Sequence, residues 1–330
     1  MKKVNSRCYA RAGLLGNPSD GYHGKAISFA FQNCYAEMDL CEFVTLEFDE
    51  ANQFESLAHF VDDVKFDEQD GGTRLLKAAL FRWLRHFPEC LETDQPLFQL
   101  SFNSNIPRQV GLAGSSAIVI AALRAFSQWY GIEVRSELLA SIALAAEIDL
   151  GISAGLQDRV AQSMQGLVYM DFDASKMHHE NNLAVGEYVH LDWSFAEHFY
   201  IAYARNIPES TQVLHGDLRK RFEAKEQKVV DTIQEIAELA VQGRNALAVG
   251  DYARLSELID RNFDLRQSIC VLNPGHVRMI EVARECGVSA KYCGSGGAIV
   301  GVCTDKSTFC LLYTSPSPRD RQKSRMPSSA

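Results

Sequence analysis

A glycine- and serine-rich segment has the residue types and the setting that can hold a phosphate group. Residues 106–117 read IPRQVGLAGSSA and lie between a predicted strand and a long predicted helix. Glycines let the backbone turn sharply and approach a ligand closely. The first turn of a helix offers unpaired N–H groups at the positive end of its dipole. The segment lacks the lysine of the Walker pattern GxxxxGK[ST], so it indicates either a different phosphate loop or a plain serine-capped turn.

Two further glycine-containing segments lie near the two ends of the chain. Residues 10–20 read ARAGLLGNPSD, which places small residues around a single Arg11. Residues 293–301 read CGSGGAIVG. The latter departs from the dinucleotide fingerprint GxGxxG because Ile299 stands where the third glycine belongs, which disfavours a nucleotide-dependent redox domain. Taken singly, these segments could also be a surface turn and a tight β-turn.

Two acidic residues at helix ends could take part in group transfer. Asp158 lies at the start of a short predicted helix, where a carboxylate could accept or orient the proton of a hydroxyl. The alternative is an acid that is merely favoured by the helix dipole. Glu147 closes the preceding apolar helix, although a helix C-terminus disfavours negative charge. It could therefore be a functional acid or an exposed helix-end residue.

Alternating strand and helix patterns supply the elements that would position these residues. Strands are predicted at 41–48, 98–103, 167–172 and 199–204, and helices at 73–87, 115–130, 136–148 and 155–164. Residues 217–270 are almost wholly helical, with breaks at Gly243 and Gly250, and are followed by a helix at 274–286 and a strand and turn at 290–303. The pattern predicts an α+β fold in two lobes, with the boundary between the lobes near residues 190–198.

Composition narrows the class of protein further. The 330 residues include 33 basic and 42 acidic ones, a net charge of −9, which argues against broad nucleic-acid binding but not against a small anionic ligand. No segment approaches the roughly 20 apolar residues of a membrane helix, and the N-terminus is a poor signal peptide. The nine cysteines form no CxxC pair, as expected of reduced thiols. We therefore expect a cytoplasmic protein without membrane or nucleic-acid partners.

The last twenty residues differ from the rest of the chain. Residues 311–330 contain eight Ser or Pro residues and four basic residues against one acid. Such a composition cannot bury enough apolar surface to become ordered. We expect a non-native or disordered tail and leave it out of the fold prediction. If the tail is non-native, the natural last element of the domain is absent as well.

Taken in order, the three glycine-containing segments resemble the three motifs of the GHMP kinases, which act on galactose, homoserine, mevalonate and phosphomevalonate. The first motif corresponds to Arg11, Leu14-Leu15-Gly16 and Asp20. The second corresponds to Pro107, Gly111, Leu112, Ala113, Gly114, Ser115 and Ser116, with one residue inserted before the serines. The third corresponds to residues 291–297 and is slightly short of the usual GxGxGG form. The resemblance extends over nearly all of residues 7–305.

The resemblance implies a fold and a set of site residues. Residues 1–192 would form a lobe like domain 2 of ribosomal protein S5, and residues 193–310 a ferredoxin-like lobe, with ATP between them and the second motif over its phosphates. Asp158 would be the catalytic acid, with Arg11 beside it. Glu147 lies eleven residues before Asp158, the separation found in mevalonate kinases. Glu147 and Ser116 would bind Mg²⁺, with Ser115 as the near alternative and Asp149 as a rival ligand. The sugar would contact Asp20, Asn17, Gly294 and Gly296.

Within this family, the sequences of three segments are most similar to those of plant-type glucuronokinases: residues 11–29, 155–172 and 211–222. That resemblance implies ATP-dependent phosphorylation of D-glucuronate at its anomeric hydroxyl. The sugar carboxylate would need a cation, ideally an arginine. The sequence leaves the choice open among Lys25, Arg159, Arg205, Arg219 and Arg221. Galactose-, arabinose- and heptose-type kinases, or a non-catalytic binding protein, are the alternatives, and the oligomeric state is undetermined.

Overall fold

The computed structural model describes residues 1–152, 155–192, 194, 196–204, 214–305 and 307–309. Arg205 and the tail at 311–330 therefore lie outside the described residues, and their predictions stay untested.

A long antiparallel hairpin runs through the molecule. Its strands are β1 (Lys3–Leu15) and β2 (Lys25–Glu42), which pair from Lys3 opposite Cys41 to Leu15 opposite Ile27. They belong to a seven-stranded sheet in the order β4-β3-β5-β2-β6-β9, with β1 also on β2. The other strands are β3 (Leu46–Asp49), β4 (Asn52–Phe54), β5 (Phe98–Ser104), β6 (Leu167–Asp171) and β9 (Tyr188–Leu191).

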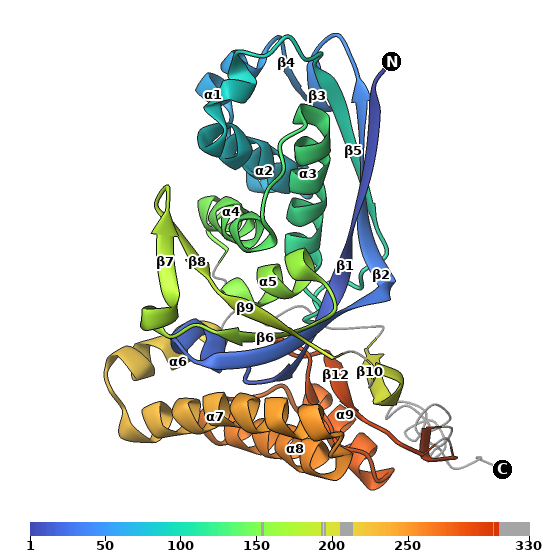
Figure 1. The fold of residues 1–330 in the computed structure, drawn as a ribbon, viewed down its shortest axis with the longest axis vertical. Coiled ribbons are helices and arrows are strands. Elements are labelled where there is room, and N and C mark those ends of the chain that lie inside the picture. The colour runs from blue at the N-terminus through green and yellow to red at the C-terminus, as the bar shows by residue number, and fades with distance from the viewer. Residues whose placement is uncertain (153–154, 193, 195, 205–213, 306, 310–330) are drawn as a thin grey trace, which may run out of the picture.

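The helices of the first half cover one face of this sheet, as Figure 1 shows. They are α1 (Leu57–Asp63), α2 (Thr73–His86), α3 (Gly114–Tyr130), α4 (Ser136–Asp149) and α5 (Leu156–Met164). A small hairpin of β7 (Met177–Glu180) and β8 (Leu183–Gly186) packs beside α4. Helix α3 is apolar along most of its length because it lies between the sheet and the other helices. The four helices predicted between residues 73 and 164 are thereby confirmed.

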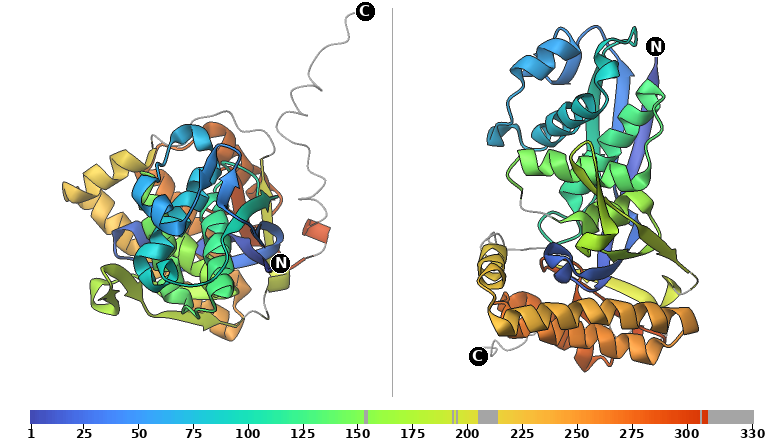
Figure 2. Two further views of the ribbon diagram at one scale, coloured as in Figure 1. Left: turned by 90° about the horizontal axis from the view of Figure 1, so that it is seen from above. Right: turned by 60° about the vertical axis from the view of Figure 1, so that its left-hand side comes forward.

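A second, three-stranded antiparallel sheet follows, in the order β10-β12-β11. Its strands are β10 (Phe199–Tyr203), β11 (Lys291–Tyr292) and β12 (Ala298–Val302), and its helices are α6 (Leu214–Glu223), α7 (Gln227–Val249), α8 (Tyr252–Ile269) and α9 (Pro274–Glu285). Helices α7 and α8 run side by side across the foot of the long hairpin (Figures 1 and 2). The first sheet ends at Leu191 and the second begins at Phe199, an interval that contains the predicted lobe boundary.

Short 3-10 turns connect several of these elements. They are η1 (Ser19–Tyr22), η2 (Glu68–Asp70), η3 (Pro88–Leu91), η4 (Ala174–Lys176) and η5 (Ala196–His198). The turn η1 follows β1 directly and carries Asp20.

Two element predictions are wrong in instructive ways. The strand predicted at 41–48 is divided between β2 and β3, because Phe43 and Val44 lie exposed in the turn between them. The break predicted at Gly243 does not occur, since α7 continues to Val249. A Cβ atom at Gly243 would lie 2.1 Å from Cδ1 of Leu15 in β1. The glycine therefore allows the helix to approach the hairpin closely rather than ending the helix.

The hydrophobic core is continuous between the two halves. One cluster of buried side chains contains Leu14 and Leu15 of β1 together with Ile236, Leu239 and Ala240 of α7.

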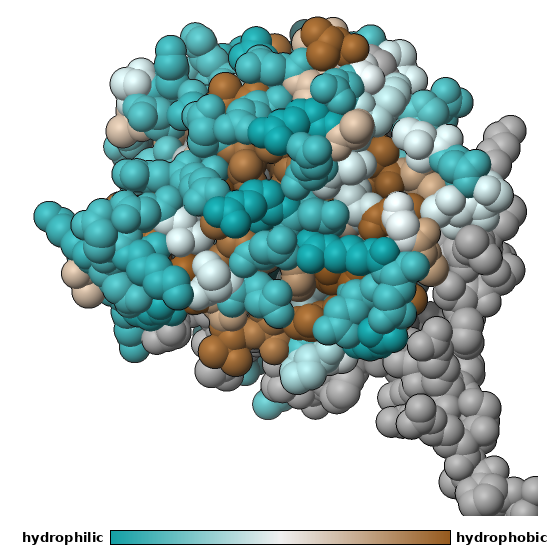
Figure 3. Space-filling model, turned by 90° about the horizontal axis from the view of Figure 1, so that it is seen from below, coloured by the Kyte–Doolittle hydropathy of each residue, from teal (hydrophilic) through white to brown (hydrophobic). Residues whose placement is uncertain are grey.

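The end of the molecule formed by α7 to α9 is mainly hydrophilic on the face in Figure 3. None of the helices in the described part of the chain is both long and apolar enough to cross a membrane.

Candidate active site

The three glycine-containing segments meet around the side chain of Arg11. Nη1 of Arg11 donates to the carbonyl oxygen of Gly111 at 2.7 Å and to that of Cys293 at 3.0 Å. A Cβ atom at Gly294 would lie 2.5 Å from the carbonyl oxygen of Gly111 and 2.8 Å from Nη2 of Arg11. Only glycine fits where three backbones approach one guanidinium so closely. Segments separated by up to 282 residues thus form one site.

Arg11 also forms an ion pair with Asp158 at the first turn of α5. Its Nε donates to Oδ1 of Asp158 at 2.7 Å. The Arg11 side chain is 4% exposed, whereas that of Asp158 is 24% exposed. Burial acts to lower the pKa of Arg11, but the charge and the hydrogen bond of Asp158, with smaller contributions from Cys293 and Asp20, together outweigh it and raise the pKa above its usual value. The pair therefore offers a carboxylate whose outer oxygen can meet a ligand while the inner one is held by a buried cation.

Asp20 lies beside this pair. A Cβ atom at Gly155, the residue before α5, would be 2.8 Å from Oδ2 of Asp20. Burial and, secondarily, the negative charge of Asp158 raise the pKa of Asp20 to about 6, against the opposing effect of Arg11. Two carboxylates and one arginine thus share a confined space, which is typical of a site that binds a polar ligand.

The start of helix α3 carries the serines of the second motif. Gln109, Gly111 and Ala113 have φ angles of +59°, +74° and +61°, so the loop uses the left-handed region three times before the helix begins at Gly114. Leu112 is buried, and its carbonyl oxygen accepts from the backbone N–H of Arg11 at 3.4 Å. Pro107 begins the loop after β5. The backbone of the loop is therefore tied directly to β1.

The structure corrects the expected pairing of Ser116 with Glu147. Ser115 Oγ donates to Oε1 of Glu147 at 2.7 Å, which makes the near alternative the actual neighbour. Ser116 is buried and donates instead to Oε1 of Gln162 at 2.7 Å. Consecutive residues at a helix start point about 100° apart, so the two serines face different neighbours.

Glu147 is not the exposed helix-end acid that the sequence left open. It is completely buried, and its Oε2 accepts from Nε of Arg159 at 2.6 Å and also from Nη2. The rival acid Asp149 forms a two-bond ion pair with Arg82. Glu147 and Ser115 therefore present two hard oxygen atoms side by side, a donor set that suits Mg²⁺ when phosphates and waters complete the shell.

The proposed sugar-contacting residues fall into two groups. Asn17 and Gly294 lie together, because Arg266 of α8 donates through Nη1 to Oδ1 of Asn17 at 2.9 Å and to the carbonyl oxygen of Gly294 at 2.6 Å. Gly296 has φ +133°, and an added Cβ would lie 2.8 Å from Nδ1 of His276. Its backbone lies against the second motif, because a Cβ at Gly111 would be 3.1 Å from the carbonyl oxygen of Gly296. Asn17 and Gly294 thus share a partner that Gly296 lacks.

Most of the cations considered for a sugar carboxylate already have acidic partners. Arg159 pairs with Glu147, Arg221 pairs with Glu226 at 2.7 Å, and Lys25 lies 3.9 Å from Asp171. Arg219 is exposed, lies over the ring of Tyr22 and donates to the carbonyl oxygen of Gly21 at 3.3 Å.

Several polar residues of the site were missed by the sequence analysis. Gln162 is completely buried and donates to the carbonyl oxygens of Tyr9 and Ala113 while accepting from Ser116. Gln157 joins Asn17 to Ser28. The signal was present in the segment LQDRVAQ, because Asp158 and Gln162 are four residues apart and so share one helix face. Arg266 lies in a segment with an ordinary amphipathic helix pattern, so the sequence did not indicate that it belongs to the site.

Lys291, at the start of the third motif, ties that motif to β1. It is almost completely buried, and its Nζ donates to the carbonyl oxygens of Gly13 at 2.7 Å and Tyr292 at 2.8 Å. Burial lowers its pKa to about 7. Lys291 therefore acts mainly as a hydrogen-bond link between the third motif and β1.

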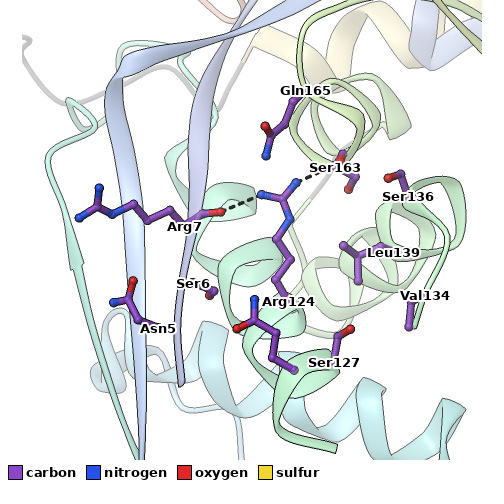
Figure 4. A pocket seen from close by; sticks show the side chains of 11 residues that line it. Asn5, Ser6, Arg7, Arg124, Ser127, Val134, Ser136, Leu139, Ser163 and Gln165 are labelled. Carbon is purple, nitrogen blue, oxygen red and sulfur yellow. Dashed lines mark hydrogen bonds between the residues drawn. The ribbon is translucent and has the colours of Figure 1, made fainter. Parts of the chain in front are cut away.

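A separate cavity of about 440 Å³ lies at the other end of α5, between β1 and helices α3 to α5 (Figure 4). Arg124 reaches across it and donates to the carbonyl oxygens of Arg7, Gln162 and Ser163. Its lining contains no carboxylate. The cavity therefore lacks the acid that the Arg11 site possesses.

Comparison with known proteins agrees with this geometry. The profile of the GHMP kinases N terminal domain matches residues 74–166. The chain is 40% identical over 314 residues to Probable glucuronokinase 2 of Arabidopsis thaliana, which covers 91% of this chain and 84% of that protein. The chain therefore belongs to the GHMP kinases and is a phosphotransferase. It is also 38% identical over 316 residues to Glucuronokinase 1 of the same plant, covering 92% of this chain and 85% of the relative.

Solved structures support the fold. The chain superimposes on the Lactococcus lactis galactokinase complexed with galactose with a TM-score of 0.73 and 14% identity, covering 94% of this chain and 88% of that one. The predicted two-lobed GHMP kinase fold is confirmed.

Proposed function

We propose that this kinase transfers the γ-phosphoryl group of ATP to the anomeric hydroxyl of D-glucuronate, giving glucuronate 1-phosphate. The assignment of glucuronate as the substrate rests on the 40% identity to an Arabidopsis thaliana protein named as a probable glucuronokinase. This identity extends over 91% of the chain. The Arg11–Asp158 pair at the meeting point of the three glycine segments supplies the reacting groups.

In this proposal Asp158 accepts or orients the proton of the attacking hydroxyl. Its side chain is the more exposed member of the pair, so a sugar hydroxyl can reach it. Arg11 keeps the carboxylate ionised and supplies positive charge near the transferred phosphoryl group. Asp20 accepts hydrogen bonds from sugar hydroxyls. Asn17, Gly294 and Gly296 complete the sugar pocket in this proposal.

The second motif holds the phosphates of ATP in this proposal. The loop from Pro107 through Gly111, Leu112 and Ala113 leads the chain to Gly114, where the first N–H groups of α3 point at an anion. Ser115 and Glu147 fit a Mg²⁺ ion because they are adjacent oxygen ligands, one half-buried and one fully buried. A bound Mg²⁺ would neutralise phosphate charge. Ser116 holds the loop in register through Gln162.

The proposal extends to the setting of the enzyme. We place it in the cytoplasm, with the free sugar acid and ATP as partners and neither nucleic acid nor membrane bound. The eight cysteines of the described residues are all free thiols, which suits a reducing compartment. The lobes would divide at residues 192–193, between the two sheets.

A sugar panel tests the proposal. The purified full chain is incubated with ATP, Mg²⁺ and glucuronate, galacturonate, galactose or arabinose, and ADP release is followed with phosphorus NMR of the product. We expect turnover on glucuronate and a phosphorus resonance coupled to the anomeric proton. Turnover on a neutral sugar instead would contradict the uronate assignment. A folded protein that binds ATP and phosphorylates none of the sugars would contradict the proposed reaction.

A further inference from the structure

Arg266 is a buried cation without an acidic partner. It projects from α8, is 5% exposed, and directs Nη1 at two neutral oxygens, Oδ1 of Asn17 and the carbonyl oxygen of Gly294. Its Nε is buried without a hydrogen-bond partner. Within the part of the chain that the structure describes, Arg266 forms no ion pair, whereas the buried Arg11 and Arg159 pair with Asp158 and Glu147.

Such an arrangement is costly unless something else compensates it. A buried charge without a counter-charge destabilises a protein, and each unpaired buried donor adds to that cost. Burial lowers the pKa of Arg266 below its usual value, and the nearby Arg11 also acts in that direction. Asp20 contributes an opposing field but forms no hydrogen bond with Arg266. The free protein therefore holds an unused positive charge in its proposed sugar site.

The neighbours of Arg266 place it on the sugar side of the site. Asn17 lies three residues before Asp20 in the same turn, and Gly294 touches Arg11. The ring of Tyr292 lies 5.5 Å from the guanidinium carbon and supports one face of it. Nη1 is committed to Asn17 and Gly294, which fixes the plane of the guanidinium. Nε is buried and has no hydrogen-bond partner. A carboxylate that met Nε together with Nη2 would form the two parallel bonds that an arginine fork offers.

We propose that Arg266 binds the carboxylate of the sugar acid and so determines the preference for a uronate over a neutral sugar. Asn17 is then a positioning residue, which orients the guanidinium. The inference rests on the proposed function and adds to it the residue that recognises the acid. None of the five cations that the sequence left open lies in α8.

The test compares a charged substrate with its neutral counterpart. Glucuronate and glucuronamide differ only in a carboxylate against an amide, so the ratio of their kcat/KM values isolates recognition of the charge. In Arg266→Met we expect the KM for glucuronate to rise by about 100-fold and the ratio to fall close to one, with the KM for ATP little changed. In Arg266→Lys, which keeps a charge but loses the planar fork, we expect a rise of about 10-fold.

Two further variants serve as controls. Arg254→Met removes an exposed arginine that pairs with Glu257 far from the site, and it should leave both substrates unaffected. Arg219→Met removes the exposed cation above Tyr22, the competing candidate. Loss of the glucuronate preference in Arg219→Met but not in Arg266→Met would overturn the inference.

The outcomes separate this inference from the proposed function. A wild-type enzyme that does not phosphorylate glucuronate overturns both. A wild-type enzyme that does so, with an unchanged substrate ratio in Arg266→Met, overturns the inference alone. An equal loss on both substrates shows a purely structural role and also overturns it. If the methionine variant does not fold, the lysine variant decides by the same ratio.

Discussion

Asp158 and Asp20 are two carboxylates at one site with different surroundings. Asp158 is held by the buried Arg11, whereas Asp20 is desolvated and has a pKa raised to about 6. Groups whose environments differ in this way can take different tasks in one reaction. Asp158 is suited to accept or orient the proton of the attacking hydroxyl, because Arg11 fixes the position of its carboxylate. Asp20 is suited to accept hydrogen bonds from sugar hydroxyls, which would offset the burial of its carboxylate.

Replacing Asp20 should raise the stability of the folded protein while it weakens sugar binding. A carboxyl whose pKa is raised in the folded state loses stability as pH rises from about 4, its unfolded value, to about 6, and the deficit is constant above that. Asp20→Asn should therefore be more stable than wild type at pH 7.5, by at most about 3 kcal/mol, and equal to it near pH 4. Urea unfolding at several pH values measures the difference.

The same variant should bind the sugar poorly. We expect the KM for glucuronate to rise at least about 10-fold in Asp20→Asn. A variant that is less stable than wild type at pH 7.5, or that keeps the wild-type KM, would contradict the role given to this carboxylate.

The two serines at the start of α3 should behave differently. Ser115→Ala removes the neighbour of Glu147 and should raise the Mg²⁺ concentration needed for half-maximal rate by about 10-fold. Ser116→Ala leaves Oε1 of Gln162 without its donor and should cost about 1–3 kcal/mol of stability. Its Mg²⁺ requirement should stay near that of wild type. Mg²⁺ titrations of the rate check both, and the reverse pattern would restore Ser116 as the ligand.

At this scale the sequence indicated types of residues but not their contacts. Arg11, Asp158 and Asp20 could be selected because the motif order narrows the choice. The direction of a side chain could not be predicted. Ser115 and Ser116 are adjacent in the sequence, and only the rotation of the helix decides which one contacts Glu147. Arg266 could not be found at all, because a buried arginine and an exposed one have the same signature in an amphipathic helix.

The elements were predictable where the periodicity is long and uninterrupted. Helices α2 to α5 follow their apolar patterns closely. The long β1–β2 hairpin was not predicted, although it carries Arg11 and supports every part of the site. Gly243 was misread because sequence alone does not distinguish a glycine that ends a helix from one that lets a helix approach another element.

The contact between the second and third motifs should depend on Gly111. Gly111→Ala puts a Cβ at φ +74° and 2.9 Å from the backbone nitrogen of Ser295, so strain and a backbone clash add together. We expect a loss of about 2–3 kcal/mol in the free energy of unfolding and a weaker affinity for ATP.

Gly131→Ala is the matched control for this substitution. Gly131 has φ +69° and open space around it, so only the left-handed strain of about 1 kcal/mol applies. Urea unfolding of the two variants gives the comparison, and equal losses would show that the contact between the motifs adds nothing.

At the scale of the whole molecule, the two lobes share one hydrophobic core. The cluster that contains Leu14 and Leu15 of β1 also contains Ile236 of α7 and Leu258 of α8. Arg11, Gly13 and Lys291 add hydrogen bonds between the two halves. Each lobe therefore depends on the other for the burial of its inner face, and the site at their junction is held by both.

We accordingly expect a single cooperative unfolding transition. Differential scanning calorimetry of the full chain should give a van't Hoff enthalpy close to the calorimetric enthalpy. Two resolved transitions, one for each lobe, would contradict the shared core.

The most direct test of the account is the turnover of Asp158→Asn on glucuronate. The site predicts that kcat falls by about 10²–10⁴-fold, because the group that accepts or orients the hydroxyl proton is lost, while ATP still binds. Asp149→Asn, whose acid pairs with Arg82 instead, should keep its kcat within about threefold. A folded, ATP-binding Asp158→Asn variant with a kcat close to that of wild type would contradict the central role of the Arg11–Asp158 pair.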